Sequence, residues 1–132
     1  KFYGQSKLAN LMFAIELQKR LESAGSSTIS VACHPGISAT NLLSRGKEHE
    51  TGRVMKALLR LVAQPASMGA LPTLCAATHP DLRGGEYIGP EGPGNTRGYP
   101  VLNNDPARVY KPDISARLWE VSEALTGTRY SI

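Results

Sequence analysis

Two short runs of β-branched and apolar residues constrain the fold more than any other feature of the sequence. The first, residues 28–33, ends in a His-Pro-Gly tripeptide, and the second, residues 86–88, leads into a stretch rich in glycine and proline. Both patterns are typical of strands that run into loops. A long stretch with helical patterns separates them, and parallel strands need such a crossover connection. The sequence therefore predicts a parallel strand pair in an α/β domain.

Helical periodicity accounts for most of the remaining chain. The predicted order is helix 3–25, strand 28–33, a long loop and an amphipathic helix within residues 37–63, helix 66–79, strand 86–88 and helix 113–126. Gly25 supplies the left-handed stop of the first helix. Pro72 interrupts helix 66–79, and the helical pattern does not explain it. Two strands are too few for a parallel sheet, which is buried on both faces, so we expect further strands upstream.

The apolar residues of the first and last helices predict which of their faces are buried. Helix 3–25 has two apolar faces, so we expect it to be covered on more than one side. These faces comprise Leu8, Leu11, Met12 and Ile15 on one, and Phe13, Leu17 and Leu21 on the other. Asp113 is the expected N-cap of the last helix, whose inward stripe comprises Ile114, Leu118, Val121 and Leu125. Trp119 lies one position off this stripe, and we expect it to pack rather than to stack on a ligand.

Composition excludes several classes of function. The formal charge of +4 comes from 15 Lys and Arg against 11 Asp and Glu, and the densest basic stretch lacks interleaved aromatic residues. This pattern does not favour nucleic-acid binding. The three histidines and two cysteines lack the close paired spacings of a zinc site, so no metal is expected. Cys33 and Cys75 lie in apolar runs and are interpreted as buried thiols, which suits a reducing cytoplasm. No apolar run is long enough to span a membrane.

Tyr3 and Lys7 form the strongest catalytic candidate. A spacing of four at the start of a helix places both side chains on one face, one turn apart. An ammonium there stabilises the phenolate and lowers the Tyr pKa from its reference near 10. Tyr3 could then act as a general acid and base near neutral pH. The spacing alone is a weak signal, because a surface cation beside an aromatic ring produces it as well.

The wider context of this pair is more specific. The segment Tyr3-Gly4-Gln5-Ser6-Lys7 is followed by the two-faced helix, the β-branched strand, and Pro35-Gly36 with Thr40 downstream. This ordered set resembles the short-chain dehydrogenases/reductases, whose active-site motif is Tyr-x-x-x-Lys and whose next strand ends in Pro-Gly followed closely by Thr. Residues 85–90 and 118–122 resemble the branch that contains retinol dehydrogenases and related carbonyl reductases.

The resemblance implies a fold, a reaction and a set of site residues. The fold would be the C-terminal half of a doubly wound, Rossmann-type parallel sheet, with about two strands and flanking helices. The family's glycine-rich dinucleotide-binding half, its Asn-Ala-Gly motif and its catalytic Ser all precede the Tyr, and none is in these residues. The reaction would be hydride transfer between NADP, or NAD, and a small carbonyl or alcohol. The implied catalytic residues are Tyr3 and Lys7; the implied cofactor contacts are Tyr3, Lys7, Pro35, Gly36, Ile37 through its backbone, and Thr40.

Three further expectations concern the surface of the protein. In the family the helix that carries the Tyr contributes to a dimer interface, so we expect a homo-oligomer through helix 3–25. The alternative to an enzyme is a non-catalytic fold fragment that self-associates through the helix from Leu8 to Leu21. The loop after Thr40 and the helix from residue 53 would form the substrate lid; the same helix, with basic and apolar sides, is the weaker candidate for a membrane-surface element.

Overall fold

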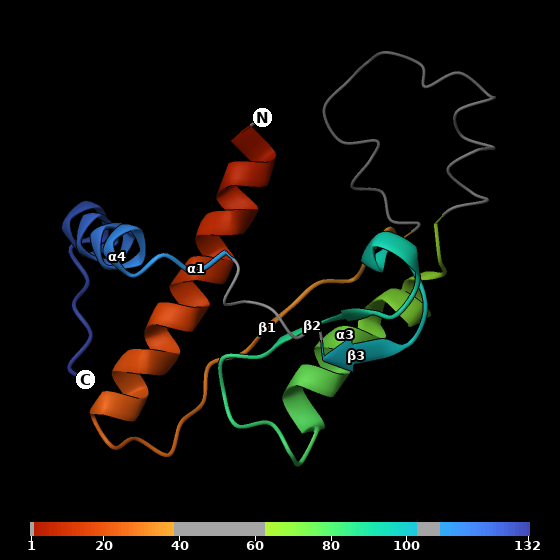
Figure 1. The fold of residues 1–132 in the computed structure, drawn as a ribbon, viewed down its shortest axis with the longest axis horizontal. Coiled ribbons are helices and arrows are strands. Elements are labelled where there is room, and N and C mark those ends of the chain that lie inside the picture. Colours follow the sequence, from red (N-terminus) through yellow and green to blue (C-terminus); the bar gives the residue numbers. More distant parts are fainter. Residues whose placement is uncertain (1, 39–62, 103–108) are drawn as a thin grey trace. The chain divides into compact units, whose positions relative to one another are not determined.

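The computed structural model describes residues 2–38, 63–102 and 109–132 (Figure 1). Thr40 and nearly all of the predicted lid, including the helix expected from residue 53, lie outside these ranges. The elements in chain order are α1 (Phe2–Ser23), β1 (Ala32–Cys33), α3 (Ala66–Thr78), β2 (Tyr87–Pro90), the 3-10 turn η2 (Pro93–Asn95), β3 (Pro100–Leu102) and α4 (Pro112–Thr126). Every predicted helix within the described ranges is present, and no end is shifted by more than two residues.

The sheet contains the predicted parallel pair and one strand more. Its order is β1-β2-β3. The Ala32 N–H donates to the Glu86 carbonyl at 2.9 Å, and the His34 N–H donates to that of Ile88 at 2.9 Å. Partners that advance together along both strands define a parallel ladder. β2 and β3 instead form an antiparallel hairpin. The prediction of about two strands was therefore short by one. The residues rich in glycine and proline after β2 were predicted to be a loop, and they form the connection of a hairpin that leads into β3.

The first strand is much shorter than predicted. Only Ala32–Cys33 is a strand, whereas residues 28–33 had been expected. The Gln18 side-chain oxygen accepts the Ser30 N–H at 2.7 Å, and the Ser30 hydroxyl donates to the Ala14 carbonyl at 2.9 Å. These contacts attach the residues just before β1 to α1. Because the Ser30 N–H is already bonded to Gln18, a longer strand could not use it for pairing.

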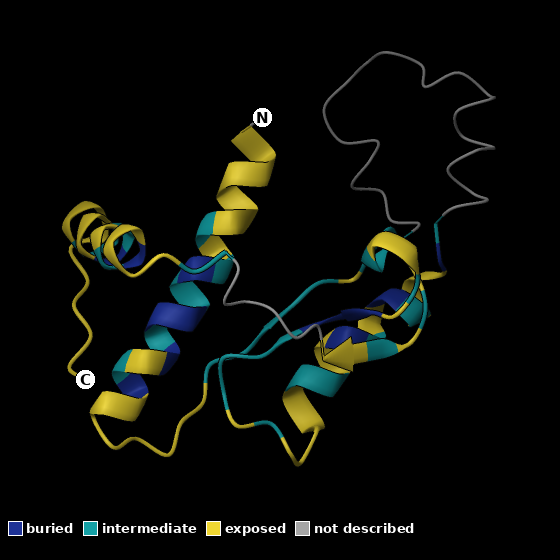
Figure 2. Ribbon diagram, viewed as in Figure 1, coloured by how far each residue is buried: buried dark blue, intermediate teal, exposed yellow. Residues whose placement is uncertain are grey.

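The chain divides into two compact units. Unit 1 comprises Lys1–Ala32, Pro80–Tyr87 and Leu102–Ile132, and unit 2 comprises Cys33–His79 and Ile88–Val101. Figure 2 shows buried residues within both of them. Each unit therefore has buried side chains of its own.

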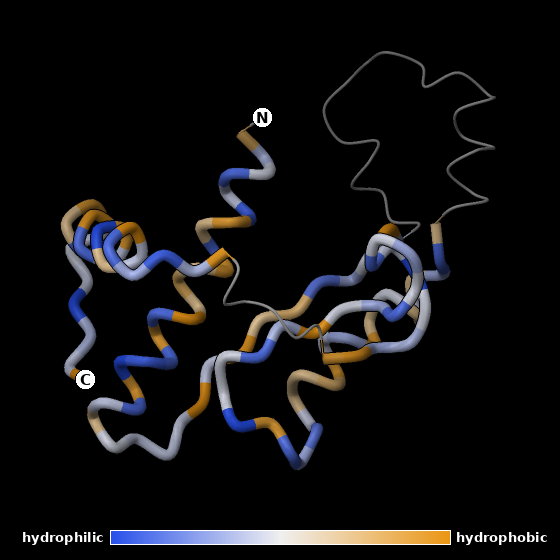
Figure 3. Tube along the Cα trace, in the orientation of Figure 1, coloured by the Kyte–Doolittle hydropathy of each residue, from blue (hydrophilic) through white to orange (hydrophobic). Residues whose placement is uncertain are grey.

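In unit 1, α4 packs against α1 through aromatic rings. The Phe13 and Trp119 rings stack, with centroids 4.9 Å apart and planes 10° from parallel. Trp119 is 3% exposed, so its predicted packing role is confirmed. This contact gives the second apolar face of α1 a partner within the chain. Hydrophobic and hydrophilic segments alternate along α1 in Figure 3, as expected for a helix with contacts on more than one side.

The predicted inward stripe of α4 was wrong. Ile114 is 53% exposed, Val121 38% and Leu125 82%, whereas Ser115 and Trp119 are buried. The indole decides the orientation because its burial removes more apolar surface from water than any single leucine. The predicted Asp113 cap was also wrong: the N-cap is Lys111, without a side-chain hydrogen bond, and Pro112 occupies the first helical position, where its fixed φ suits a helix start.

In unit 2, α3 lies against the segment that follows β1. A Cβ on Gly69 would collide with the Ser38 side chain, which shows how close the two backbones come. Pro72 lies inside α3 and is among the most completely buried side chains of the protein. The unexplained proline therefore has a packing role, and the burial of its ring offsets the loss of a backbone donor.

Candidate active site

Tyr3 and Lys7 lie in the first two turns of α1 and contact each other. The Lys7 Nζ lies over the Tyr3 ring, 5.5 Å from its centroid, which is a cation–π distance. The Tyr3 side chain is exposed, with 68% of the residue accessible. The Ser6 hydroxyl donates to the Tyr3 carbonyl at 2.8 Å and so is used within the helix. The pair thus presents a phenol and an ammonium on one open side of α1.

The predicted cofactor turn, Pro35 to Ile37, is in unit 2. Gly36 has a φ of +64°, a conformation that L side chains rarely adopt. A Cβ at this position would also collide with the Thr96 carbonyl oxygen and the Pro90 ring. The sequence pattern identified this glycine as part of a turn, and the structure adds a second reason for it, the close approach of the loop after β2.

Both backbone polar groups of Ile37 make contacts within unit 2. Its N–H donates to the Thr96 carbonyl at 2.7 Å, and its carbonyl accepts the Gln64 N–H at 2.9 Å. A carbonyl oxygen has two lone pairs, so the Ile37 oxygen keeps the capacity to accept a second hydrogen bond. The resemblance implies a contact between the Ile37 backbone and a cofactor. The Ile37 N–H is already used by the Thr96 carbonyl, so the contact compatible with this arrangement is one through the Ile37 carbonyl.

His34 precedes the turn and supports it. The Gly36 N–H donates to His34 Nδ1 at 3.3 Å, which requires that nitrogen to be unprotonated. Burial lowers the pKa of His34 from 6.5, because it disfavours the charged imidazolium. His34 is therefore a neutral acceptor beside the turn.

Gln64 is a contributor to this region that sequence analysis missed. Its side chain is buried, with only 3% of the residue exposed. Its Nε2 donates to the Pro35 carbonyl at 2.9 Å, and its Oε1 accepts the Gly98 N–H at 2.9 Å. No periodicity or motif marks this residue in the sequence, because its partners come from two distant segments.

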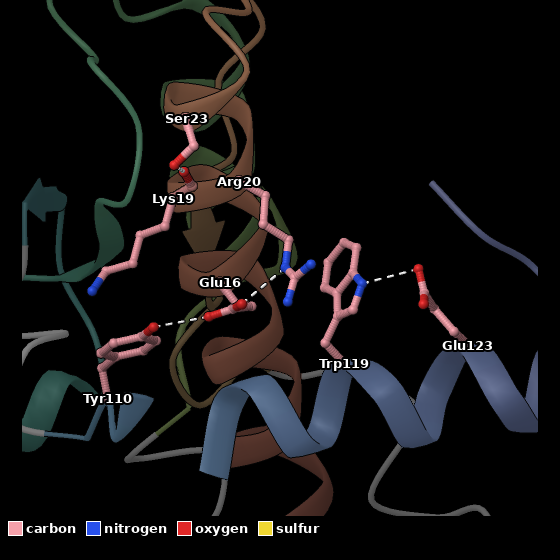
Figure 4. Close-up of polar contacts among 7 residues, drawn as sticks. All are labelled: Glu16, Lys19, Arg20, Ser23, Tyr110, Trp119 and Glu123. Carbon is pink, nitrogen blue, oxygen red and sulfur yellow. Dashed lines mark hydrogen bonds and ion pairs between the residues drawn. The ribbon is translucent and has the colours of Figure 1, made fainter. Parts of the chain in front are cut away.

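A second polar cluster, which the sequence also did not reveal, lies between α1 and the segment before α4 (Figure 4). Glu16 is 7% exposed and accepts hydrogen bonds from Arg20 Nε and the Tyr110 hydroxyl, both at 2.8 Å. Lys19 Nζ lies 3.9 Å from the Tyr110 ring centroid. Burial, followed by the hydrogen bond to Glu16 and its charge, raises the pKa of Tyr110 to about 12. This phenol is therefore a neutral hydrogen-bond donor with a structural role.

Metal and membrane features are also absent from the parts of the chain that the structure describes. Within them, no group of three or more His, Cys, Asp or Glu side chains could hold a metal ion. No helix in these ranges is both long and apolar enough to cross a bilayer. Cys33 and Cys75 are unbridged and half-buried, and the Cys33 sulfur lies 3.7 Å from the Thr73 hydroxyl.

Comparisons with known proteins decide the family. A short chain dehydrogenase/reductase of Macrophomina phaseolina is 30% identical over 130 residues, which cover 94% of this chain and 58% of that protein. Retinol dehydrogenase 14 of Homo sapiens is 30% identical over 131 residues, covering 95% of this chain and 35% of that protein. The chain belongs to the short-chain dehydrogenase/reductase family. No protein-family model matches it.

A solved structure supports the same fold. A crystal structure of an uncharacterised protein from Mycobacterium paratuberculosis is 36% identical, with a TM-score of 0.68, and the match covers 98% of this chain and 40% of that one. The chain spans 24%, 58% and 29% of three of the curated short-chain dehydrogenases/reductases that it matches, and the matched parts are mostly their C-terminal portions. The fold class predicted from the sequence, the C-terminal part of such a domain, is thus confirmed.

Each unit offers groups that suit part of a dinucleotide. Within unit 1, the exposed phenol and ammonium one turn apart suit the hydroxyl groups of a ribose. Within unit 2, the turn has a carbonyl able to accept, which suits a carboxamide. Thr40, the remaining implied contact, is outside the described ranges. The phenol and ammonium belong to unit 1, and the turn belongs to unit 2.

Proposed function

We propose that the protein interconverts an alcohol and a carbonyl by hydride transfer with NADP, or alternatively NAD, and that Tyr3 is the general acid and base. The observation that carries the proposal is the Tyr3–Lys7 pair, a phenol and an ammonium in contact on the open side of α1. Membership of a family of oxidoreductases supports it. The name of one relative, retinol dehydrogenase, suggests a hydrophobic alcohol as the substrate class.

Each site residue has a proposed task. The nicotinamide, when bound, supplies or accepts the hydride. Tyr3 gives a proton to the substrate oxygen in the reduction and takes it back in the oxidation. The Lys7 ammonium donates hydrogen bonds to the ribose. Pro35 and Gly36 shape the turn under the nicotinamide, the Ile37 carbonyl accepts from its carboxamide, and Thr40 contributes a hydroxyl.

The test compares two exposed tyrosines in the complete protein. Tyr3→Phe should lower kcat by about 10²- to 10⁴-fold, the usual contribution of general acid–base catalysis. The Kd for the cofactor is measured alongside, because Tyr3 is also an implied cofactor contact. Tyr99 is 64% exposed, close to the 68% of Tyr3, and Tyr99→Phe serves as the matched control with unchanged kcat. Full activity in Tyr3→Phe would refute the assignment of the general acid.

We further propose that the 132 residues alone are inactive and bind dinucleotide weakly. Support comes from their partial coverage of their relatives. Titration of the isolated chain with NADPH, followed by energy transfer from Trp119, tests this directly. Saturable binding with the affinity of the complete protein would contradict it.

We also propose a homo-oligomer through helix 3–25. Phe2 is 86% exposed and Leu8 42%, whereas Phe13 is already stacked on Trp119. The alternative function is a non-catalytic fold fragment that self-associates through the helix from Leu8 to Leu21. Sedimentation of Leu8→Glu tests the contact that both share: an assembly through this helix dissociates, and an unchanged assembly would contradict it. The activity assay with Tyr3→Phe separates the enzyme from the non-catalytic alternative.

The proposed location is the cytoplasm. The two unbridged cysteines support a reducing compartment. A relative in Brassica napus is named as chloroplastic, so localisation differs among similar proteins. Fractionation of cells that express the tagged complete protein tests this proposal.

A further inference from the structure

One residue, Gln64, holds both ends of the turn at Gly36. Its backbone N–H donates to the Ile37 carbonyl at 2.9 Å, and its side-chain Nε2 donates to the Pro35 carbonyl at 2.9 Å. The two carbonyls flank the glycine. The turn therefore cannot move relative to residue 64 without the loss of a hydrogen bond.

The same side chain connects the turn to the loop after β2. Gln64 Oε1 accepts the Gly98 N–H at 2.9 Å, and in that loop the Thr96 carbonyl accepts the Ile37 N–H at 2.7 Å. Gly36 lies close against this loop, since an added Cβ would collide with the Thr96 carbonyl. A buried amide that uses both its donor and its acceptor in this way joins three backbone segments into one rigid unit.

We propose that the Gln64 side chain is a positioning residue that fixes the Pro35–Ile37 turn for the nicotinamide end of the cofactor. The proposal rests on the proposed function, and it adds a residue that touches neither cofactor nor substrate. Its effect passes through the Ile37 carbonyl, whose second lone pair is available to a carboxamide. Loss of this one hydrogen bond corresponds to about a 2- to 10-fold change in affinity.

Gln18 provides a matched control. It is a buried glutamine too, 5% exposed, and its side chain also joins separate segments, with Nε2 donating to Glu22 at 2.8 Å and Oε1 accepting the Ser30 N–H at 2.7 Å. These partners all belong to unit 1 and not to the predicted cofactor turn. Gln18→Ala and Gln64→Ala should therefore lower Tm by similar amounts.

The experiment measures NADP⁺ affinity of the complete protein and these variants by calorimetry, with Tm recorded for each. Gln64→Ala is expected to weaken binding by about 2- to 10-fold, the net contribution of about one hydrogen bond, and Gln18→Ala to leave Kd unchanged. Equal affinity of Gln64→Ala and wild type would overturn the proposal, as would an equal loss of affinity in Gln18→Ala, which would indicate a general effect of stability.

A second variant is independent of the folding of Gln64→Ala. Gln64→Glu keeps the shape of the side chain, but its carboxylate has no donor for the Pro35 carbonyl until it is protonated. Its reference pKa is about 4.3, and burial raises it. The NADP⁺ affinity of this variant should recover towards the wild-type value as pH falls towards 5. A wild-type-like profile overturns the positioning role, whereas a wild type that does not bind NADP⁺ overturns the proposed function and this role with it.

Discussion

The assignment of the buried face of α4 can be tested by truncating one residue from each competing face. Trp119 is 3% exposed and Leu125 is 82% exposed, although the apolar pattern of the sequence predicts that Leu125 points inward. Trp119→Ala removes the ring that stacks on Phe13 and also the indole N–H that donates to Glu123 at 3.0 Å. We expect the two substitutions to differ greatly in their effect on the free energy of unfolding.

The magnitudes follow from burial. A buried indole removes about 150–250 Å² from water, or roughly 4–6 kcal/mol at about 25 cal/mol per Å², an upper bound because the unfolded chain already buries part of this surface. Truncations of buried Trp to Ala cost about 3–5 kcal/mol, and we expect Trp119→Ala to fall in that range. Leu125→Ala should stay within about 0.5 kcal/mol of the wild type, as for exposed positions.

Urea unfolding of the wild type and both variants, followed by circular dichroism, measures these differences. Circular dichroism is preferred because Trp119 is the single tryptophan of the chain and is lost in one variant. If Leu125 were on the buried face, Leu125→Ala would cost about 2–5 kcal/mol. Such a value, together with a small effect of Trp119→Ala, would refute the packing of α4 against α1 through the indole.

Three further predictions concern single residues. Burial holds the pKa of His34 in the folded protein below 6.5. Its contribution to stability is therefore complete above pH 6.5 and is lost as pH falls through the folded pKa. In denaturation curves measured from pH 8 to 5, His34→Asn should lack this part of the acid dependence. Tyr110 has the opposite sign: its pKa is raised to about 12, so the stability that it contributes is present below pH 10 and lost as pH rises towards 12, and Tyr110→Phe should remove that alkaline loss in the same assay. Gly36→Ala should lower the free energy of unfolding by more than about 1 kcal/mol, because Gly36 has a positive φ and an added Cβ would collide with the Thr96 carbonyl. Gly4 lies in α1 with open space around it, so Gly4→Ala should raise the free energy of unfolding by about 0.5–1 kcal/mol. Equal effects of the two substitutions would contradict the geometry at Gly36.

Local patterns carried most of what could be predicted. The four-residue spacing of Tyr3 and Lys7 placed them on one side of a helix, where the structure finds them in contact. The β-branched run before His34 indicated a strand that leads into a turn, and Gly36 is in the left-handed conformation that such a turn requires. These features depend on neighbours within about one helical turn, so the sequence order itself encodes them.

Tertiary structure decided the features whose partners are distant along the chain. The Tyr110 hydroxyl and Glu16 are 94 positions apart, and Gly98 and Gln64 are 34 apart. No local sequence pattern, which extends over a few helical turns at most, can therefore pair either set of residues. The buried face of α4 was likewise unpredictable from periodicity, because the choice between the leucine stripe and Trp119 depends on the Phe13 ring of another helix. The sequence determined the helices, the parallel pair and the Tyr3–Lys7 spacing, since each is a local preference. Only packing decided which side chains are buried, because burial is a property of surfaces that meet after the chain has folded.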